Sequence, residues 1–432
     1  MKDRIHNRIF WLSSMAISFF LPVFGRILPL IILIMVLNWM INARIGKNIS
    51  LLFREKKRLQ TLSFALIYIL YVAGLLYTSN FDYAWFDLEV KFSLLIFPLI
   101  FATTPWPILS PYQYLSVLWA FVAGCMIGAF IILGHAAFNL FSYNYSGSFY
   151  YTKLAWYFHT SYLAMYYNFA ISFLLLSLLR DRRPTLAKIL FIGGMVIFFI
   201  WMILLLSSKA GLITLALILI GSVFYCWFIL RNFRAGTAII GIGLIVFLSG
   251  YLISPVAFSR ISAAEHAMAN NSNINRINPE SNADRMVVWT TAVEIIGNNF
   301  LFGVGTGDVK DALLEGYGKR NAIPALQHKY NAHCQYLQTF ITLGITGFLL
   351  YILLFILPSI FALKSKHYLY LAFLLIFAVN TLTESMLEVQ AGVIFYAFFN
   401  IILFTHSGAF SSEAHIKTKA GTRFPESPPE SK

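Results

Sequence analysis

Long apolar runs recur along almost the whole chain, and they constrain its fold more than any other feature. They extend from Ile9 to His406, and many approach the roughly 20 residues that a helix needs to cross about 30 Å of hydrocarbon. Hydrophobic residues make up 59% of the sequence and charged residues only 12%, which excludes an ordinary soluble multidomain enzyme. The sequence therefore predicts an all-α integral membrane protein.

The apolar runs predict about twelve transmembrane helices. Their centres lie near Met15, Ile34, Tyr68, Ile96, Cys125, Tyr167, Ile197, Ile218, Phe247, Leu350, Ile376 and Phe399. Helices 1–9 fall in residues 1–257, a large and partly helical loop in 258–332, helices 10–12 in 333–406, and a polar, Pro-rich tail in 407–432. The composition of the tail is typical of a disordered extension, and we expect it in the cytoplasm.

The basic residues predict the orientation, because Lys and Arg are retained on the cytoplasmic side during insertion. With a cytoplasmic N-terminus, 21 of the 32 basic residues fall on that side and four in short outer segments. The other seven lie in the 258–332 loop, which is long enough to translocate whatever its charge. Most of the formal charge of +14 is thus a topological signal, and we expect no nucleic-acid partner.

The regular part of the outer loop begins with a predicted helix from about Asn282 to Ile296, where apolar residues repeat at helical spacing. Arg285 shares the inward face of this helix with Trp289. A buried guanidinium is costly unless it meets an anion. An internal carboxylate such as Glu384, a side chain that reaches past Trp289 to water, and a substrate phosphate remain alternatives.

A glycine-rich run, LFGVGTG at Leu301 to Gly307, follows this helix. Its three glycines permit backbone conformations that other residues avoid, and they could turn amides toward an anion. Because the run follows a helix and not a strand, it implies no dinucleotide-binding or Walker-type loop. A tight turn and an anion-binding loop both remain possible.

His333 stands where the outer loop gives way to the tenth apolar run. Asn331 is predicted to cap that helix, which places His333 in its first turn. A helix N-terminus disfavours positive charge and so favours a neutral imidazole that can accept a proton. Gly344 and Gly347 farther along permit close packing of another helix. His333 is therefore either a general base or a structural hydrogen-bonding residue.

These motifs, in this order, resemble the O-antigen ligase and O-antigen polymerase superfamily of bacterial envelope enzymes. R-x-x-x-W begins at Arg285, LFGVGTG at Leu301, H-x-x-Y-L-Q at His333 and G-x-x-G at Gly344. The layout of twelve spans, with the large outer loop between the ninth and the tenth, is also similar to that family. The resemblance covers most of residues 9–406.

The resemblance implies a GT-C-like glycosyltransferase of the bacterial inner membrane with a periplasmic active site. Such enzymes move a glycan from an undecaprenyl pyrophosphate carrier to an acceptor hydroxyl, without a metal or another cofactor. His333 would be the general base and Arg285 would hold the pyrophosphate. The expected partners are the lipid-linked glycan, a lipid A core acceptor and membrane lipids. The run from Arg285 to Gly347 favours a ligase, with a polymerase as the alternative within the family.

Two lysines are further candidates for contact with the pyrophosphate. LLSSKAGL places Lys209 where the family commonly has Ser-Arg, and lysine keeps the charge but loses the bidentate geometry of arginine. An interfacial lysine that ends a helix is the alternative for Lys209. Lys91 begins the fourth predicted span. Asp87 and Glu89 could instead hold a divalent metal, but two carboxylates alone rarely do so, and charge balance with Lys91 is simpler.

Three other polar residues lie at the predicted outer ends of spans. Glu384 and Glu388 are four residues apart, share a helical face and could orient His333 or bind the acceptor, or they are solvated helix ends. His159 is predicted to be an interfacial hydrogen-bonding residue. A transporter or flippase is the alternative from another class, but it would favour internal duplication and charged or broken helices at mid-membrane, and the sequence shows neither.

Overall fold

The computed structural model describes residues 2–42, 52, 55–104, 108–181, 183–253 and 282–406. Over these residues the chain forms helices and no strand, which confirms the all-α fold class. The predicted tail at 407–432 and the first part of the predicted outer loop, 258–281, lie outside the described residues.

The helices follow one another along the chain with short connections. The α-helices of the first half are α1 (Lys2–Phe20), α2 (Leu28–Asn42), α4 (Lys56–Ser63), α5 (Leu66–Ala73), α6 (Phe81–Lys91), α7 (Ser93–Thr103), α8 (Pro111–Tyr143), α9 (Tyr151–Leu154), α10 (Thr160–Leu179) and α11 (Leu186–Leu206). Those of the second half are α12 (Lys209–Phe224), α13 (Phe233–Ile253), α15 (Asn282–Asn298), α16 (Val309–Lys319), α17 (Ile323–His328), α18 (Gln335–Lys364), α19 (Tyr368–Asn380) and α20 (Gln390–Thr405). Single turns of other helix types are η1 (Gly25–Ile27), η2 (Gly74–Tyr77), η3 (Ser146–Phe149), η4 (Tyr225–Ile229) and η5 (Met386–Glu388).

Six of the described helices are long and apolar enough to cross a membrane, and the bent pair formed by α4 with α5 and η2 would make a seventh. Four further apolar helices, in α7, α13, α19 and α20, are shorter. Each of the twelve predicted centres falls within a helix, although α1 carries charged residues in its first two turns. The protein is thus a multi-pass membrane protein with six or seven clear candidate spans, and the number twelve stays a prediction.

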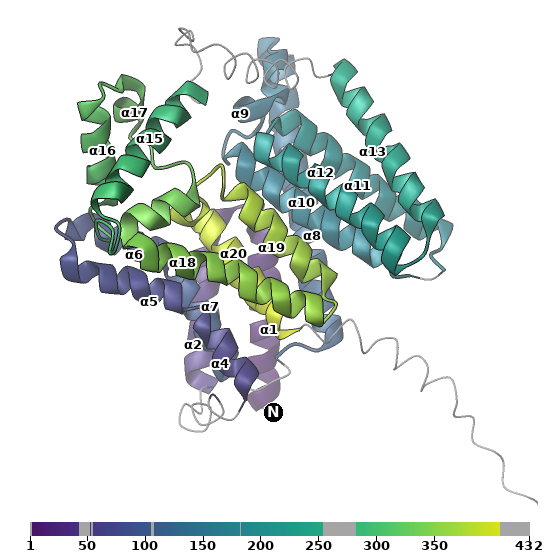
Figure 1. Ribbon diagram of the computed structural model, residues 1–432. Coiled ribbons are helices and arrows are strands. Elements are labelled where there is room, and N and C mark those ends of the chain that lie inside the picture. Colours follow the sequence, from purple (N-terminus) through teal and green to yellow (C-terminus); the bar gives the residue numbers. More distant parts are fainter. Residues whose placement is uncertain are drawn as a thin grey trace, which may run out of the picture.

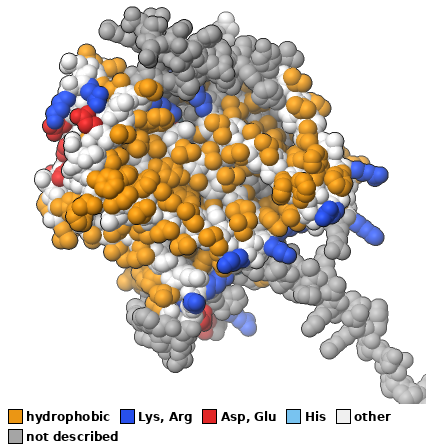
Figure 2. Space-filling model, in the orientation of Figure 1, with side chains coloured by type: hydrophobic (Ala, Val, Ile, Leu, Met, Phe, Trp, Pro, Cys, Tyr) orange, Lys and Arg blue, Asp and Glu red, His pale blue; other side chains and the backbone are white. Residues whose placement is uncertain are grey.

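The described helices of the predicted outer loop and the chain's N-terminus lie at opposite ends of the molecule. Helices α15, α16 and α17 form a group at the upper left of Figure 1, and the N-terminus lies at the bottom. Hydrophobic side chains cover most of the middle of the face in Figure 2. Lys and Arg side chains border its lower right edge, and others lie with Asp and Glu side chains at its upper left. Such an apolar belt between polar borders is typical of a body surrounded by lipid.

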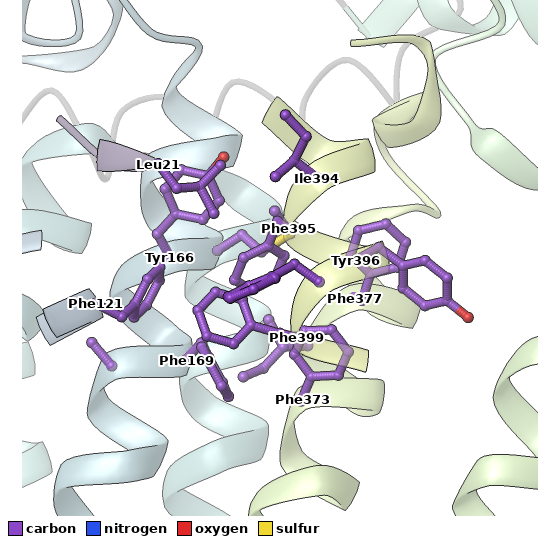
Figure 3. Packing of buried hydrophobic residues seen from close by; sticks show 14 of the residues in the cluster. Leu21, Phe121, Tyr166, Phe169, Phe373, Phe377, Ile394, Phe395, Tyr396 and Phe399 are labelled. Atoms are coloured by element: carbon purple, nitrogen blue, oxygen red, sulfur yellow. The ribbon is translucent and has the colours of Figure 1, made fainter. Parts of the chain in front are cut away.

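An aromatic core joins α8, α10, α19 and α20 (Figure 3). The ring of Phe399 lies 4.9 Å from those of Phe121 and Phe169, and Phe395 lies 5.3 Å from Phe373. These edge-to-face and tilted contacts are the arrangements that aromatic pairs favour. The core fixes the facing ends of α19 and α20, and with them the connection that carries two of the glutamates discussed below.

Helix α18 is broken at Gly344, whose φ of 64° and ψ of −160° are not helical. The break frees the carbonyls of Ile341 and Thr342, which accept hydrogen bonds from the amides of Val304 and Gly305 at 2.8 and 3.0 Å. A Cβ at Gly344 would overlap the backbone of the facing loop, so only glycine fits there. The glycine-rich run is therefore a tight turn that packs on α18. The close contact at Gly344 is with this loop, whereas the sequence predicted a contact with another helix.

Candidate active site

Helix α15 confirms the helix predicted from about Asn282 to Ile296 and extends it by two residues. Its buried face is centred on Val288 and Ala292, so Arg285 lies at the edge of that face and not at its middle. Trp289 is 36% exposed, and its Nε1 donates a hydrogen bond to the Ala332 carbonyl at 3.1 Å. Helix α15 is thereby tied to the segment that precedes α18.

His333 lies outside α18, so the prediction that it occupies the first helical turn is wrong. The helix begins at Gln335, and Cys334 takes the cap position that was predicted for Asn331. The Asn331 side chain instead accepts a hydrogen bond from the His333 amide at 3.0 Å, and His333 has a φ of 45°. A positive φ is uncommon for such a residue, and surrounding contacts must hold it. Gln338 supplies one, because its side chain accepts the Ala332 amide at 3.0 Å.

Glu384 joins Arg285 and His333. Its Oε1 lies 3.0 Å from Nη2 of Arg285, and its Oε2 lies 3.4 Å from Nδ1 of His333. The exposed fractions of the Arg285, His333 and Glu384 side chains are 21%, 19% and 10%. The internal carboxylate considered for Arg285 is therefore present, and the same carboxylate brings the two foremost candidate residues together across 99 and 51 positions of sequence.

The electrostatics of this cluster keep Glu384 ionised at neutral pH. Burial alone would raise the pKa of Glu384, but its hydrogen bond with His333 and the charges of His159 and Arg285 outweigh burial and hold the pKa below its ordinary value. Burial lowers the pKa of His159, with Glu384 opposing the shift and His333 and Arg285 adding to it. His159 is thus a neutral member of the cluster near pH 7.

A pocket opens beside this cluster at the N-termini of α10 and α12. It is lined by Tyr151, His159, Thr160, Ser161, Ser207, Ser208, Lys209, Ala210, Arg285, Thr383 and Glu384. The His159 side chain caps α10 by accepting the Ser161 amide, and Ser208 caps α12 by accepting the Gly211 amide. Two helix N-termini together with two cationic side chains favour an anionic ligand. The pocket contains Arg285 and Lys209, two of the predicted pyrophosphate contacts, and also the hydrogen-bonding His159.

Lys91, the third predicted pyrophosphate contact, lies in a different, buried cluster. Its side chain is 0% exposed and forms ion pairs with Asp87 and, at 3.1 Å, with Glu388, while its ammonium lies 4.7 Å from the centre of the Tyr71 ring. Binding a substrate phosphate would require it to leave two buried carboxylates. Glu89 is exposed whereas Asp87 is buried, and over the described residues no three His, Cys, Asp or Glu side chains are placed to hold a metal ion.

Glu384 and Glu388 do not share a helical face, because the connection between α19 and α20 is not α-helical. Glu384 lies in a turn, and Glu388 ends η5, so the two carboxylates reach different clusters. Gln335 clamps this connection to the start of α18: its Oε1 accepts the Leu387 amide at 2.7 Å, and its Nε2 lies 3.3 Å from Glu388.

The comparisons with known proteins find a match to one part of the chain, which contains some of the candidate site residues. Residues 194–352 match a family model described as O-Antigen ligase. This match, over less than half of the chain, supports the resemblance to the O-antigen ligase and polymerase superfamily. It contains Lys209, Arg285 and His333, whereas His159 and Glu384 lie outside it. The comparison with curated proteins finds no match.

The sequence interpretation gave no role to two polar residues that organise the site, although Gln338 belongs to the H-x-x-Y-L-Q motif. Gln335 and Gln338 are buried, with exposed fractions of 0% and 1%. Two glutamines one turn apart at the start of an apolar helix are a signal that could have been used, since a buried amide must be hydrogen-bonded. Nothing in the sequence pointed to Tyr151, which reaches the pocket from the four-residue helix α9.

Proposed function

We propose that the protein is an O-antigen ligase that transfers a glycan from undecaprenyl pyrophosphate to a hydroxyl of the lipid A core oligosaccharide. The reaction takes place at the periplasmic face of the bacterial inner membrane, with both chain termini in the cytoplasm. The supporting observation is that Arg285, Glu384 and Lys209 line one pocket. His333 is not among the residues that line this pocket, but it contacts Glu384 at 3.4 Å. A base and cations for a diphosphate leaving group are the two requirements of this transfer.

His333 is the general base in this proposal. With a hydrogen on Nδ1 directed to Glu384, Nε2 carries the lone pair that takes the proton of the acceptor hydroxyl. The hydroxyl oxygen attacks the anomeric carbon from the face opposite the pyrophosphate. The bond from that carbon to the pyrophosphate oxygen breaks, and its electron pair leaves with the diphosphate. A single displacement of this kind inverts the anomeric centre.

Arg285 and Lys209 stabilise the departing pyrophosphate, so the step is proposed to proceed without a metal. Glu384 balances the charge of Arg285 at 3.0 Å. The guanidinium keeps further donors for a phosphate, and its fork matches the spacing of phosphate oxygens. Lys209 adds a point charge at the N-terminus of α12, where the partial positive charge of the helix acts in the same direction. Lys91 has a structural role in this proposal.

Loss of the His333 imidazole should nearly abolish transfer. We expect purified His333→Ala in detergent, supplied with lipid-linked glycan and lipid A core, to form product about 10²- to 10⁴-fold more slowly than the parent, the usual contribution of a general base. His328→Ala is the matched control, because this exposed histidine at the end of α17 stacks on Tyr330 and, unlike His333, is not bonded to Glu384. A His333→Ala protein that elutes and melts like the parent but transfers at the parental rate would refute the mechanism.

Ligase and polymerase activities are distinguished in the host cell. Deletion of the gene should remove all long glycan chains from the core, as seen on a lipopolysaccharide gel, while polymer accumulates on the carrier. A core that instead carries single repeat units would identify a polymerase. Complementation with the parental gene should restore the pattern, and complementation with His333→Ala should not.

A further inference from the structure

A second pocket is lined in part by α9 and the residues after it, a segment that also borders the candidate active site. Helix α9 places Tyr151 on the active-site pocket and the next two residues, Thr152 and Lys153, on the second pocket. Trp156 also lines the second pocket, and His159, three residues later, lines the first. A segment of nine residues thus borders both pockets, so a ligand that occupies the second pocket lies beside the active site.

One polar group of the second pocket lacks a partner. Ser148 lines the pocket and is 1% exposed, and its hydroxyl has no hydrogen-bond partner among the described residues. A buried hydroxyl without a partner is costly, and rotation of the Ser148 side chain toward the pocket would let a ligand hydroxyl supply the missing partner. Asn139, Thr152 and Lys153 add further hydrogen-bonding groups to the same wall.

The second pocket also has an apolar, aromatic surface. Trp156 packs against His135 in a tilted arrangement, with ring centres 4.8 Å apart and an interplanar angle of 30°, yet it remains 55% exposed. The faces of a sugar ring carry C–H groups, whereas its hydroxyls lie around the rim. An indole face beside amide, hydroxyl and ammonium groups matches both parts of such a ring. No carboxylate lines the described pocket, which favours a neutral or acidic sugar over an amine.

We propose that this pocket is a saccharide-binding subsite that holds one pyranose residue of a glycan next to the candidate active site. Trp156 packs against the ring, and Ser148 and Asn139 bond its hydroxyls. Lys153 accommodates a carboxylate or phosphate substituent where the sugar carries one. The proposal rests on the proposed function, since both the lipid-linked donor glycan and the core acceptor supply such residues.

A binding experiment tests the subsite without catalysis. Full-length His333→Ala in detergent is titrated with two free probes, the delipidated core oligosaccharide and the repeat-unit oligosaccharide released from the carrier, and binding is followed by saturation-transfer NMR. We expect at least one probe to bind, and Trp156→Ala in this background to weaken it about tenfold, as removal of an aromatic anchor does. Trp85→Ala is the control, because Trp85 is 62% exposed on α6 and lines neither pocket.

The identity of the probe assigns the subsite. Binding of the core oligosaccharide alone makes it the acceptor subsite, and binding of the repeat unit alone makes it a donor subsite. Ser148→Ala, a smaller change, should weaken the same probe in the same direction. The proposal is overturned if neither probe binds, or if Trp156→Ala and Trp85→Ala bind equally well.

Kinetics separate failure of the subsite from failure of the proposed function. In the otherwise unaltered protein, Trp156→Ala should raise KM for one saccharide about tenfold with little change in kcat. If the parent transfers glycan and Trp156→Ala changes neither KM nor binding, the subsite is wrong and the proposed function stands. If probes bind through Trp156 but the parent transfers nothing, the subsite stands and the proposed function is wrong.

Discussion

Two cation–carboxylate clusters, both built on the connection between α19 and α20, differ chiefly in burial. Glu384 pairs with Arg285 and contacts His333 at the edge of a pocket, and the Arg285 side chain is 21% exposed. Glu388 pairs with Lys91, whose side chain is 0% exposed and also pairs with Asp87. Similar charges therefore lie in two environments, one open to a ligand and one sealed from it.

The difference in burial assigns different roles to the two cations. Arg285 can exchange part of its contact with Glu384 for an incoming anion, because solvent and the pocket reach it. Lys91 cannot, because removing one partner of a buried ion pair leaves an uncompensated charge in a medium of low dielectric constant. A cation near the active site is thus a candidate for substrate binding only where its present partner can be replaced.

The largest effect on stability should follow replacement of Lys91. Lys91→Met leaves Asp87 and Glu388 buried without their cation, and we expect it to lower the free energy of unfolding by about 3–5 kcal/mol. Thermal unfolding in detergent measures this loss. Combining Lys91→Met with Asp87→Asn should restore part of it, since one of the unpaired charges is removed. A Lys91→Met protein as stable as the parent would show that the buried cluster contributes nothing.

Replacement of Arg285 should lower the activity strongly and the stability only slightly. We expect Arg285→Met to reduce kcat/KM by about 10- to 100-fold, while its stability changes by only about 0–1 kcal/mol, since the pair is partly exposed to solvent. Arg285→Lys should recover part of the activity, because it restores the charge without the bidentate geometry. The comparison between the clusters fails if Arg285→Met and Lys91→Met lose the same stability, or if Arg285→Met keeps full activity.

Glu384 should act through His333. Glu384→Gln keeps the shape of the side chain and removes its charge, and we expect kcat to fall about tenfold because the imidazole loses its carboxylate partner. The decisive measurement is a double-mutant cycle on the transfer rate. In the His333→Ala background, Glu384→Gln should cost much less than in the parent. Equal costs in the two backgrounds would assign Glu384 to substrate binding alone.

The smallest expected effect is a pH dependence of stability from His159. Burial holds the pKa of His159 below its ordinary value of 6.5, so below pH 6.5 the unfolded chain binds a proton that the folded chain does not. The contribution of neutral His159 to the stability of the fold is complete above pH 6.5. It is lost as the pH falls from 6.5 toward the pKa of His159 in the folded protein. Glu384, whose pKa is below its ordinary value of 4.5, stays ionised down to pH 5.

Melting temperatures between pH 5 and 8 test this effect. The parent should lose stability below pH 6.5, and His159→Gln should have a flatter profile over the same range. Parallel profiles for the two proteins would show that His159 does not contribute to the pH dependence. Because His159 also caps α10, the slope is the informative quantity and the absolute melting temperature is not.

Much of the architecture and part of the site could be predicted from local pattern. The apolar runs determined an all-helical membrane body, since span length and hydropathy are properties of contiguous residues. Helical spacing determined α15 and placed Arg285 near its buried face. The order of Arg285, the glycine-rich run and His333 pointed to one family, which the match over residues 194–352 supports.

Tertiary structure decided what each of these residues contacts. The turn conformation of His333 depends on side chains of Asn331 and Gln338, and periodicity carries no information about them. The contact between Glu384 and Arg285 joins residues 99 positions apart in the sequence. Helices distant in sequence also decide whether a cation is buried from solvent, as Lys91 is, or exposed to it, as Arg285 partly is. The physical reason is that the sequence pattern reports local backbone geometry and average burial, whereas the energy of a charge depends on every group that surrounds it.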